Sequence, residues 1–449
     1  MERLEKSMAP VADWLTRNKV LSAIRDGFII TTPIVIIGSF FLLLSNFPVP
    51  GYSEFMAGIF GENWTFNLDK VSTVAFSCVS LLSALGIGYS YAKELNQSNR
   101  ILPAITALVS FLILAPQSHP DFVNADGDAF GGFGFKHLGT QGIFLAMIVA
   151  LVSVRVYSFA MDRKLTIKLP DGVPPAVMES FEALIPAGFA MLLAFITNVL
   201  VGMTSFETLH NLVYSLLQAP LVNLGRLRLF EIVYQFLSSL FWFFGINGPA
   251  VTNTIFGPIH KALTLENYEA FQAGLEMKNI FTQGFGDFFG NFGGGGSTLG
   301  LVIMMSFLAK SERMKTLGKL SLPAGIFGIN EPIIFGLPIV LNPVMLIPFL
   351  LTPVLNIIVA TIATKIGFIP ITLGVQLPWT TPILFSGFLV TGSIRASILQ
   401  FFMLLMNMAV YYPFFRVLDK QFLAEEMNKV EEADELDELS FDDLDLDDL

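Results

Sequence analysis

The chain has 449 residues, of which 53% are hydrophobic and only 14% charged, whereas soluble domains hold about 25% charged residues. The net charge of −11 comes from the last segment: residues 421–449 contain 13 acids and one base, and the other 24 acids and 25 bases nearly balance. This composition excludes a soluble globular protein, and we expect neither a nucleic-acid partner nor a metal or other cofactor. The one cysteine, Cys78, excludes a disulfide framework, and we expect it to be a small packed residue.

Apolar stretches of about the 20 residues that a spanning helix needs recur along the chain. The predicted spans are Phe28–Phe47, Val71–Tyr91, Gly139–Met161, Ala183–Met203, Arg228–Ile246, Leu299–Lys310, Asn342–Ala363 and Ile394–Phe415. The strict alternation of an outer-membrane barrel is absent. The sequence therefore predicts an all-α polytopic membrane protein.

Lysine and arginine in short loops mark the cytoplasmic side of a membrane protein. By this rule we expect both termini and the Lys93–Arg100 connection inside, and the loop Pro116–His137 outside. An even number of spans follows, and we expect about ten. Glu2 and Glu5 interrupt the start of the chain, so we expect no signal peptide but an amphipathic lead-in over Ala9–Lys19.

The chain divides into two halves and a tail. Residues 1–204 are predicted as continuous helices, whereas Gly, Pro, Asn and Thr crowd the apolar sequence of residues 205–420 and favour hairpins that enter and leave on one side. Phe206–Arg226 is predicted as an amphipathic linker. Residues 421–449 form an acidic cytoplasmic tail, for which we expect disorder or, as an alternative, docking to a partner.

The most informative pattern is the hexapeptide Phe-Gly-Ile-Asn-X-Pro, which occurs at Phe244–Pro249 and again at Phe327–Pro332. Glycine and proline break a helix, and lipid tolerates the exposed backbone only where it lines a cavity or is buried in protein. Paired breaks of this kind indicate a substrate site near the membrane midplane.

The second copy carries the acid Glu331 in apolar sequence. A carboxylate at membrane depth is costly and by default functional, although it can simply cap a half-helix. Burial favours the protonated form of a carboxyl group, which suits a general base or a proton carrier.

The second copy belongs to a longer pattern: Gly-x-Asn-Glu-Pro, then Phe-Gly-x-Pro, then Asn-Pro. This pattern resembles the membrane-embedded enzyme IIC of bacterial phosphotransferase-system sugar transporters, most nearly the lactose, cellobiose and diacetylchitobiose type. The segments Trp242–Gly248, Gly293–Leu299 and Leu377–Pro382 support the resemblance, which covers the chain to about Phe422.

The resemblance implies a homodimer in the bacterial cell membrane, each protomer having about ten spans and two re-entrant hairpins. The first half would dimerise and the second half would hold the sugar. A separate phosphocysteine subunit, IIB, supplied by IIA, would phosphorylate the sugar on its 6-hydroxyl during translocation. A β-linked disaccharide such as cellobiose is the expected substrate.

The residues fit that chemistry. Glu331 would accept the proton of the sugar hydroxyl or orient it. Asn330 would hydrogen-bond sugar hydroxyls, and Trp379 and Trp242 offer faces on which a pyranose ring can stack, unless they only anchor the membrane interface. The list of expected substrate-binding residues is Asn330, Trp379, Trp242, Gln376 and Asn291.

The glycine-rich loop, residues 291–298, precedes a predicted helix. Consecutive backbone N–H groups at such a place attract anions, which predicts a phosphate site at Gly294, Gly295, Ser297 and Thr298. Close packing of helices through small residues is the alternative. The loop lacks the Gly-Lys-[Ser/Thr] ending of a nucleotide-binding P-loop.

In the first copy this chain departs from the resembled pattern, because Asn247 stands where related transporters have a histidine that shares the catalytic site. An amide can hydrogen-bond but cannot titrate. Three interpretations stay open: Asn247 orients the sugar while Glu331 supports phosphoryl transfer, the protein is a facilitator, proton-coupled transporter or sensor, or another histidine substitutes. His260 is the nearest in sequence; His119 and His137 are expected at the surface, and His210 is expected to be structural.

Overall fold

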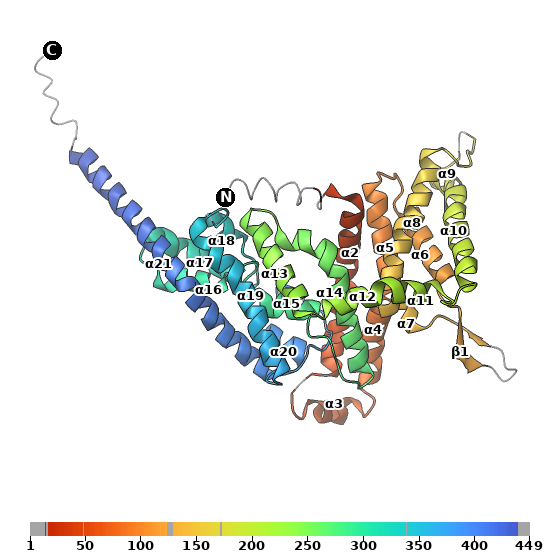
Figure 1. Cartoon of the computed structure of the whole chain (residues 1–449), viewed down its shortest axis with the longest axis horizontal. Coiled ribbons are helices and arrows are strands. Elements are labelled where there is room, and N and C mark those ends of the chain that lie inside the picture. Colours follow the sequence, from red (N-terminus) through yellow and green to blue (C-terminus); the bar gives the residue numbers. More distant parts are fainter. Residues whose placement is uncertain are drawn as a thin grey trace, which may run out of the picture.

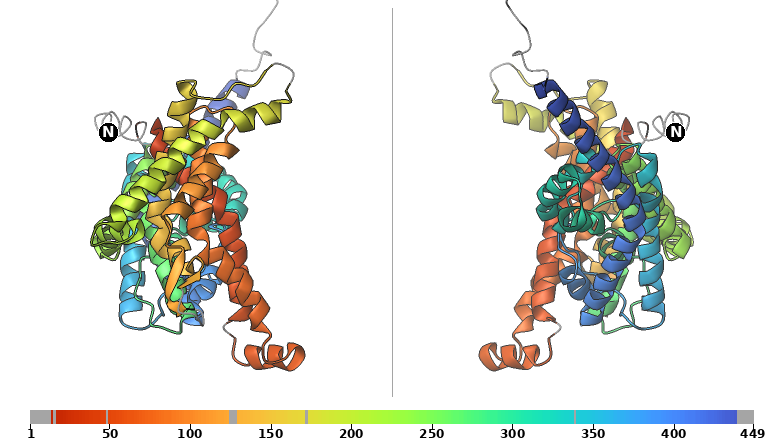
Figure 2. Two further views of the ribbon diagram at one scale, coloured as in Figure 1. Left: turned by 90° about the vertical axis from the view of Figure 1, so that its right-hand side faces the viewer. Right: turned by 90° about the vertical axis from the view of Figure 1, so that its left-hand side faces the viewer.

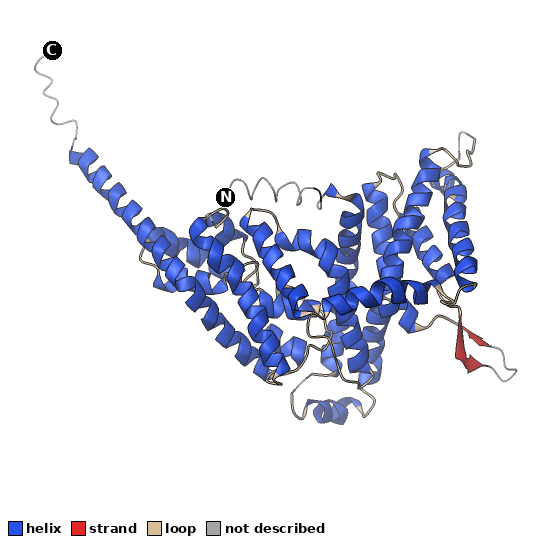
Figure 3. Ribbon diagram, in the orientation of Figure 1, coloured by secondary structure: helices blue, strands red, loops and turns tan. Residues whose placement is uncertain are grey.

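The computed structural model describes residues 14, 17–47, 49–123, 129–170, 173–337 and 339–438. The molecule is elongated, with the amino-terminal and carboxyl-terminal halves side by side (Figure 1). Strands β1 (Ser118–Val123) and β2 (Ala129–Gly131) form a short antiparallel hairpin, and the other regular elements of the described residues are helices (Figure 3). The predicted class of all-α polytopic membrane protein is confirmed.

The amino-terminal half is a bundle of apolar helices. Its first helix begins after Asn18, whose Oδ1 accepts the amide hydrogens of Val20 and Leu21 at 3.0 and 3.1 Å. Helices α2 (Lys19–Ser45) and α5 (Val79–Glu94) approach so closely that a Cβ on Gly86 would lie 2.6 Å from the carbonyl oxygen of Gly27. The helices of this half are α2 (Lys19–Ser45), α3 (Tyr52–Phe60), α4 (Thr65–Ser77), α5 (Val79–Glu94), α6 (Ile101–Leu114), α7 (Phe135–Leu138), η1 (Thr140–Gly142), α8 (Ile143–Asp162), α9 (Pro175–Glu182) and α10 (Leu184–Gly202).

The predicted span over 71–91 is bent rather than continuous. Helices α4 and α5 meet at an angle of 47°. Cys78 is the residue between them and is partly buried, so it is a packed residue at a bend. Helix α3 lies beyond the end of the bundle (Figure 2), with the large apolar side chains of Phe55, Ile59 and Phe60 exposed.

Five helices of the described chain are long and apolar enough to cross a membrane, and the bent pair makes six. Helices α6 and α16 are apolar but shorter. The other predicted spans correspond to observed helices, with ends that differ by a few residues, and α6 is an apolar helix that the sequence prediction missed. Because the second half divides into short helices, the count of about ten spans stays a prediction.

The predicted linker over 206–226 is helical and lies between the two halves (Figure 1). It consists of α11 (Leu209–Val213), the π-helical turn η2 (Tyr214–Gln218) and α12 (Ala219–Gly225). His210 is buried here, with its Nε2 3.2 Å from the carbonyl oxygen of His137. Burial lowers the pKa of His210 to about 4, which favours the neutral ring at pH 7 and agrees with the structural role expected for this residue.

The carboxyl-terminal half contains many short helices around the glycine-rich loop. Helices α15 and α16 flank this loop and hold 8 and 10 residues, about 12 and 15 Å, too short to cross the ~30 Å hydrocarbon core. Helix α16 turns back at residues 309–311 and packs against α17. The helices of this half are α13 (Arg228–Phe243), α14 (Gly248–Gln272), α15 (Gln283–Gly290), α16 (Leu299–Leu308), α17 (Glu312–Ile326), α18 (Glu331–Gly336), α19 (Pro343–Lys365), α20 (Phe385–Thr391) and α21 (Ile394–Glu438).

The expectation of a disordered tail is wrong for residues 421–438. Helix α21 continues through the boundary expected at 420 and ends at Glu438; residues 439–449 lie outside the described part. Its buried Asp419 accepts the amide hydrogens of Lys310 and Ser311 at 2.9 and 3.0 Å. Glu426 accepts from the Ser311 hydroxyl at 2.7 Å and from the amide of Arg313 at 2.9 Å. Acids of α21 therefore satisfy the free N–H groups at the start of α17 and hold the helix against the protein.

Two contacts join the halves close to the second-half loops. The hydroxyl of Ser39 on α2 accepts from the backbone amide of Gln376 at 2.8 Å. The ring of Tyr268 on α14 stacks on Phe76 of α4, with 3.9 Å between ring centroids.

Candidate functional site

The first copy of the hexapeptide (244–249) ends one helix and begins the next. Helix α13 closes with Gly245 in the left-handed region, at φ +76°, and the amide of Ile246 bonds the carbonyl oxygen of Phe241 at 3.0 Å. This is a Schellman C-cap, in which glycine avoids the steric cost that a Cβ would bring. Helix α14 then begins at once, with Pro249 in its first turn.

The second copy (327–332) has the same helix C-cap, although its asparagine differs in backbone conformation, with ψ 4° at Asn330 and 100° at Asn247. Helix α17 closes with Gly328 at φ +80°, the amide of Ile329 bonds the carbonyl oxygen of Ala324 at 3.0 Å, and Pro332 stands in the first turn of α18. The two predicted helix breaks are confirmed, and they are one structural motif used twice.

The two asparagines of the motif do different things. Asn247 is exposed and caps α14, its Oδ1 accepting from the amide of Ala250 at 3.0 Å. Asn330 is 4% exposed and does not cap α18; its Nδ2 donates to the carbonyl oxygen of Gly295 at 2.6 Å. The second copy is therefore tied to the glycine-rich loop.

The glycine-rich loop passes between the two copies. A Cβ on Gly294 would lie 2.5 Å from Cγ of Asn330, and one on Gly295 would lie 2.5 Å from Cδ1 of Trp242, just before the first copy. Glycine is required here because the neighbouring side chains occupy the space of a Cβ. The structure thus brings together Trp242, the loop and Asn330, which the sequence places in three separate segments.

The hydroxyls of Ser297 and Thr298 hold the loop together. Ser297 Oγ donates to the carbonyl oxygen of Gly290 at 2.8 Å and accepts from the amides of Phe292 and Asn356, each at 2.9 Å. Thr298 Oγ1 donates to the carbonyl oxygen of Gly293 at 2.9 Å. Both side chains are fully buried. In this conformation both hydroxyls are used in hydrogen bonds within the protein. Phosphate binding at the loop stays a prediction.

The remaining predicted residues lie around this centre. Glu331 is exposed at the start of α18, directly after Asn330. Trp379 is 62% exposed and lies against the second copy, with its carbonyl oxygen 3.3 Å from the position of a Cβ on Gly328. Gln376 is buried, and its Nε2 has no hydrogen-bond partner within the described chain.

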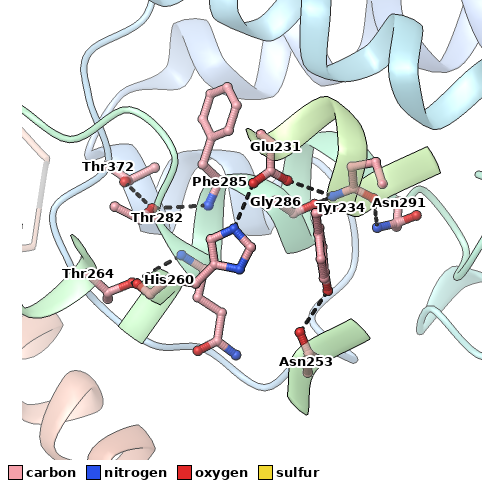
Figure 4. A network of polar contacts seen from close by, with 12 residues as sticks. Glu231, Tyr234, Asn253, His260, Thr264, Thr282, Phe285, Gly286, Asn291 and Thr372 are labelled. Atoms are coloured by element: carbon pink, nitrogen blue, oxygen red, sulfur yellow. Dashed lines mark hydrogen bonds and ion pairs between the residues drawn. The ribbon is translucent and has the colours of Figure 1, made fainter. Parts of the chain in front are cut away.

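Sequence reasoning missed a buried row of polar side chains that ends at Asn291, the first residue of the loop (Figure 4). His260 Nε2 lies 2.8 Å from Glu231 Oε2, Gln235 Nε2 donates to Glu231 Oε1 at 2.9 Å, and Asn291 Nδ2 donates to Gln235 Oε1 at 2.8 Å. The first three side chains are at most 3% exposed. One signal was available: Glu231 is the only acid of α13, and Gln235 follows it by one helical turn. The partner His260, 29 positions away, gave no local signal.

His260 does not take the place of a histidine at position 247. Helix α14 runs unbroken from Gly248 to Gln272, so the 13 residues between the two positions correspond to about 20 Å along the helix. The ring instead pairs with Glu231 and lies edge-on to Tyr234, with 4.9 Å between ring centroids.

Comparison with known proteins identifies this arrangement. Residues 25–353 match the model of the family described as Phosphotransferase system, EIIC. The chain belongs to this family. It is 41% identical over 427 residues to the lichenan permease IIC component of Bacillus subtilis (strain 168), covering 94% of each chain. It is also 41% identical to the PTS system cellobiose-specific EIIC component of Geobacillus stearothermophilus, covering 94% of this chain and 95% of the relative.

A solved EIIC structure has the same fold. The transporter ChbC, the IIC component of the N,N'-diacetylchitobiose-specific phosphotransferase system, superposes with a TM-score of 0.91 at 39% identity, covering 94% of this chain and 99% of that one. The resemblance inferred from the second hexapeptide is therefore confirmed, and the chain is a membrane-embedded EIIC component.

Proposed function

We propose that this EIIC component binds an extracellular β-linked disaccharide and translocates it with phosphorylation of its 6-hydroxyl by a separate phosphocysteine subunit. The observation that carries the proposal is the contact between Asn330 and Gly295, because Glu331 follows Asn330 directly in the chain and Trp242 lies against Gly295. The relatives named for lichenan, cellobiose and diacetylchitobiose support the substrate class, because these sugars share β linkages.

Each residue of the site has a role in this proposal. Glu331 accepts the proton of the 6-hydroxyl as the phosphoryl group arrives. Trp379, exposed beside the second copy, stacks on a sugar ring. Trp242 is buried against Gly295, so it supports the glycine-rich loop and does not offer the free stacking face that the sequence predicted. The unpartnered Nε2 of Gln376 donates to a sugar hydroxyl.

The first copy contributes Asn247 where a histidine stands in related transporters. Its Oδ1 is used by the helix cap, which leaves the Nδ2 donors for the sugar or the phosphoryl oxygens. Asn247 therefore orients the substrate, and Glu331 does the proton chemistry. Gly294 and Gly295 are partly exposed, and we propose that their backbone N–H groups bind phosphate.

The working unit is a homodimer in the bacterial cell membrane with soluble IIB and IIA partners on the cytoplasmic side. The start of α2 and helix α9 lie at one end of the molecule, and α3 and the β hairpin at the opposite end (Figures 1 and 2). This arrangement supports the orientation predicted from the basic loops, in which the amino terminus is cytoplasmic and the β hairpin external.

The test uses cells that lack other β-glucoside permeases and contain this chain with IIB and IIA proteins. Labelled cellobiose is supplied, and the internal product is separated by anion exchange. We expect cellobiose phosphate, and about a 100-fold or greater loss for Glu331→Gln, because general-base catalysis contributes about 10²–10⁴. The matched control is Glu54→Gln, which changes an exposed acid on the peripheral helix α3 and should have no effect.

Accumulation of unphosphorylated sugar that collapses with the proton gradient would instead identify a proton-coupled transporter. Full activity of Glu331→Gln would remove Glu331 from the site.

A further inference from the structure

The polar row, defined as His260, Glu231, Gln235 and Asn291, runs without a gap from the interior of α14 to the first residue of the glycine-rich loop (Figure 4). The side chains of Glu231 and Gln235 are fully buried. Buried polar groups of this kind are costly unless each is satisfied. The row therefore calls for a reason beyond packing.

The row has a direction. The Oε1 atom of Glu231 accepts, so Gln235 must turn its Nε2 toward it and its Oε1 toward Asn291. Asn291 must then turn its Nδ2 toward Gln235. This leaves Asn291 Oδ1 free, and no donor within the described residues bonds it. A second and longer bond, from Gln235 Nε2 to the carbonyl oxygen of Gly286 at 3.2 Å, favours the same orientation, but the carboxylate of Glu231 is the stronger acceptor.

Helix α15 is shaped to let the row lie against its backbone. A Cβ on Gly286 would lie 2.8 Å from Glu231 Oε1, and one on Gly290 would lie 2.6 Å from Gln235 Nε2. The two glycines are four residues apart, as are Glu231 and Gln235, so both pairs lie on facing surfaces of their helices. The next residue after Gly290 is Asn291 itself, which ties its position to the row.

The row also lies near the proposed sugar site. Gln235 and Trp242 are on the same helix, and seven residues correspond to about 10 Å along it. Gln235 holds the start of the glycine-rich loop through Asn291, while Trp242 lies against Gly295 further along the same loop.

We propose that Glu231 and Gln235, held by His260, are positioning residues that fix the amide of Asn291 so that its Oδ1 faces the sugar as a hydrogen-bond acceptor. The inference rests on the proposed function, in which Asn291 binds the substrate. The consequence is selectivity: the site requires a donor hydroxyl at one position of the disaccharide, and an analogue without that hydroxyl leaves a polar atom unpaired.

The test moves the carboxylate of the row from position 231 to position 291 by substitution. Binding of cellobiose and of monodeoxy analogues, each of which lacks one hydroxyl, is measured with the purified full-length protein in detergent. For the unchanged protein we expect one analogue to bind about 10- to 100-fold more weakly than cellobiose. In Glu231→Gln the new amide accepts from His260 and donates to Gln235. Gln235 then turns over, giving up its longer bond to Gly286, and Asn291 presents Nδ2. The selectivity against that analogue should fall to about threefold or less.

The reversal can be repaired. In Asn291→Asp alone, Gln235 Oε1 faces a carboxylate oxygen, and cellobiose binding should weaken. In the double variant Glu231→Gln with Asn291→Asp, Gln235 is free to donate to Asp, whose other oxygen accepts from the sugar, so selectivity should return. Glu231→Asp, which keeps the acceptor, should also retain it. If Glu231 only stabilised the fold, the losses of cellobiose binding in the two single variants would add in the double variant, and selectivity would not return.

The control for losing a buried carboxylate is Asp419→Asn, at the far contact between α21 and α17. It should lower thermal stability in detergent without changing the analogue profile. Two outcomes would overturn the inference. One is that Glu231→Gln keeps the selectivity of the unchanged protein. The other is that cellobiose and all analogues bind equally more weakly in both single variants and in the double variant. The binding assay needs no phosphotransfer partner. If the variants show the expected pattern of analogue binding but the cells make no cellobiose phosphate, the proposed function is wrong and this inference still holds.

Discussion

The two hexapeptides share five of their six residues and the same helix C-cap, and they are used differently. Both end a helix in a Schellman cap at a glycine with positive φ, and both start a new helix within three residues. In the first copy the asparagine caps its own helix, whereas in the second it reaches across to the carbonyl oxygen of Gly295. Local sequence determines the backbone of such a motif, but the partner that tertiary packing supplies decides the role of its side chain.

The largest expected effect comes from separating the second copy from the glycine-rich loop. In Gly294→Ala the new Cβ would lie 2.5 Å from Asn330 Cγ, on a backbone at φ +91°. Overpacking and the left-handed conformation together cost about 3 kcal/mol in this arrangement, so the free protein should relax by moving Asn330 away from the loop. Restoring the arrangement on binding then costs up to this amount, and cellobiose affinity should fall by up to about 100-fold in equilibrium binding. Gly274→Ala is the control, because its φ is +65° but its Cβ would meet open space. Equal losses in both variants would contradict the role of the Asn330 contact.

The next effect distinguishes the two asparagines directly. Asn330→Asp replaces the donor to Gly295 by an oxygen, which should lower the free energy of unfolding by about 2 kcal/mol or more. Asn247→Asp keeps the accepting oxygen of the helix cap, and aspartate caps as well as asparagine, so the change should stay within about 0.5 kcal/mol. Denaturant titration of both variants in detergent measures the difference. Similar losses would mean that the two side chains share one role.

A smaller and equal effect should follow from the shared backbone. Gly245→Ala and Gly328→Ala each force alanine into the left-handed region, at φ +76° and +80°, and each should cost about 1–2 kcal/mol. Thermal unfolding of the two variants in detergent should give similar shifts. A much larger loss in only one copy would show that its glycine serves close packing rather than the turn.

The smallest effect is expected where this chain departs from its relatives. Because Glu331 is proposed to do the proton chemistry, Asn247→His should change the rate of cellobiose phosphorylation by less than about tenfold. The measurement is initial product formation with saturating IIB and IIA. A much larger gain would show that the amide at 247 limits phosphoryl transfer, and would favour a facilitator or sensor role for the natural chain.

Sequence reasoning succeeded where the physics is local. The long apolar runs became helices, and each Gly-Ile-Asn-X-Pro became a break, because backbone sterics and lipid exposure act over a few residues. The family followed from the second copy and its neighbouring Gly-x-Pro and Asn-Pro. The expectation for the tail failed between 421 and 438 because the acids of α21 meet the free amides at the start of α17, a contact between residues about 110 positions apart.

The site shows the same division. The sequence by itself determined the membrane class, the two helix breaks, the family and the candidate residues around Glu331, since these depend on composition and short motifs. Only the tertiary structure decided that Asn330 and Trp242 contact one loop, that Ser297 is committed to bracing it, and that Glu231 and His260 form a buried pair behind Asn291. The physical reason is that hydrogen bonds between distant segments depend on how helices pack, and no local pattern of residues specifies their partners.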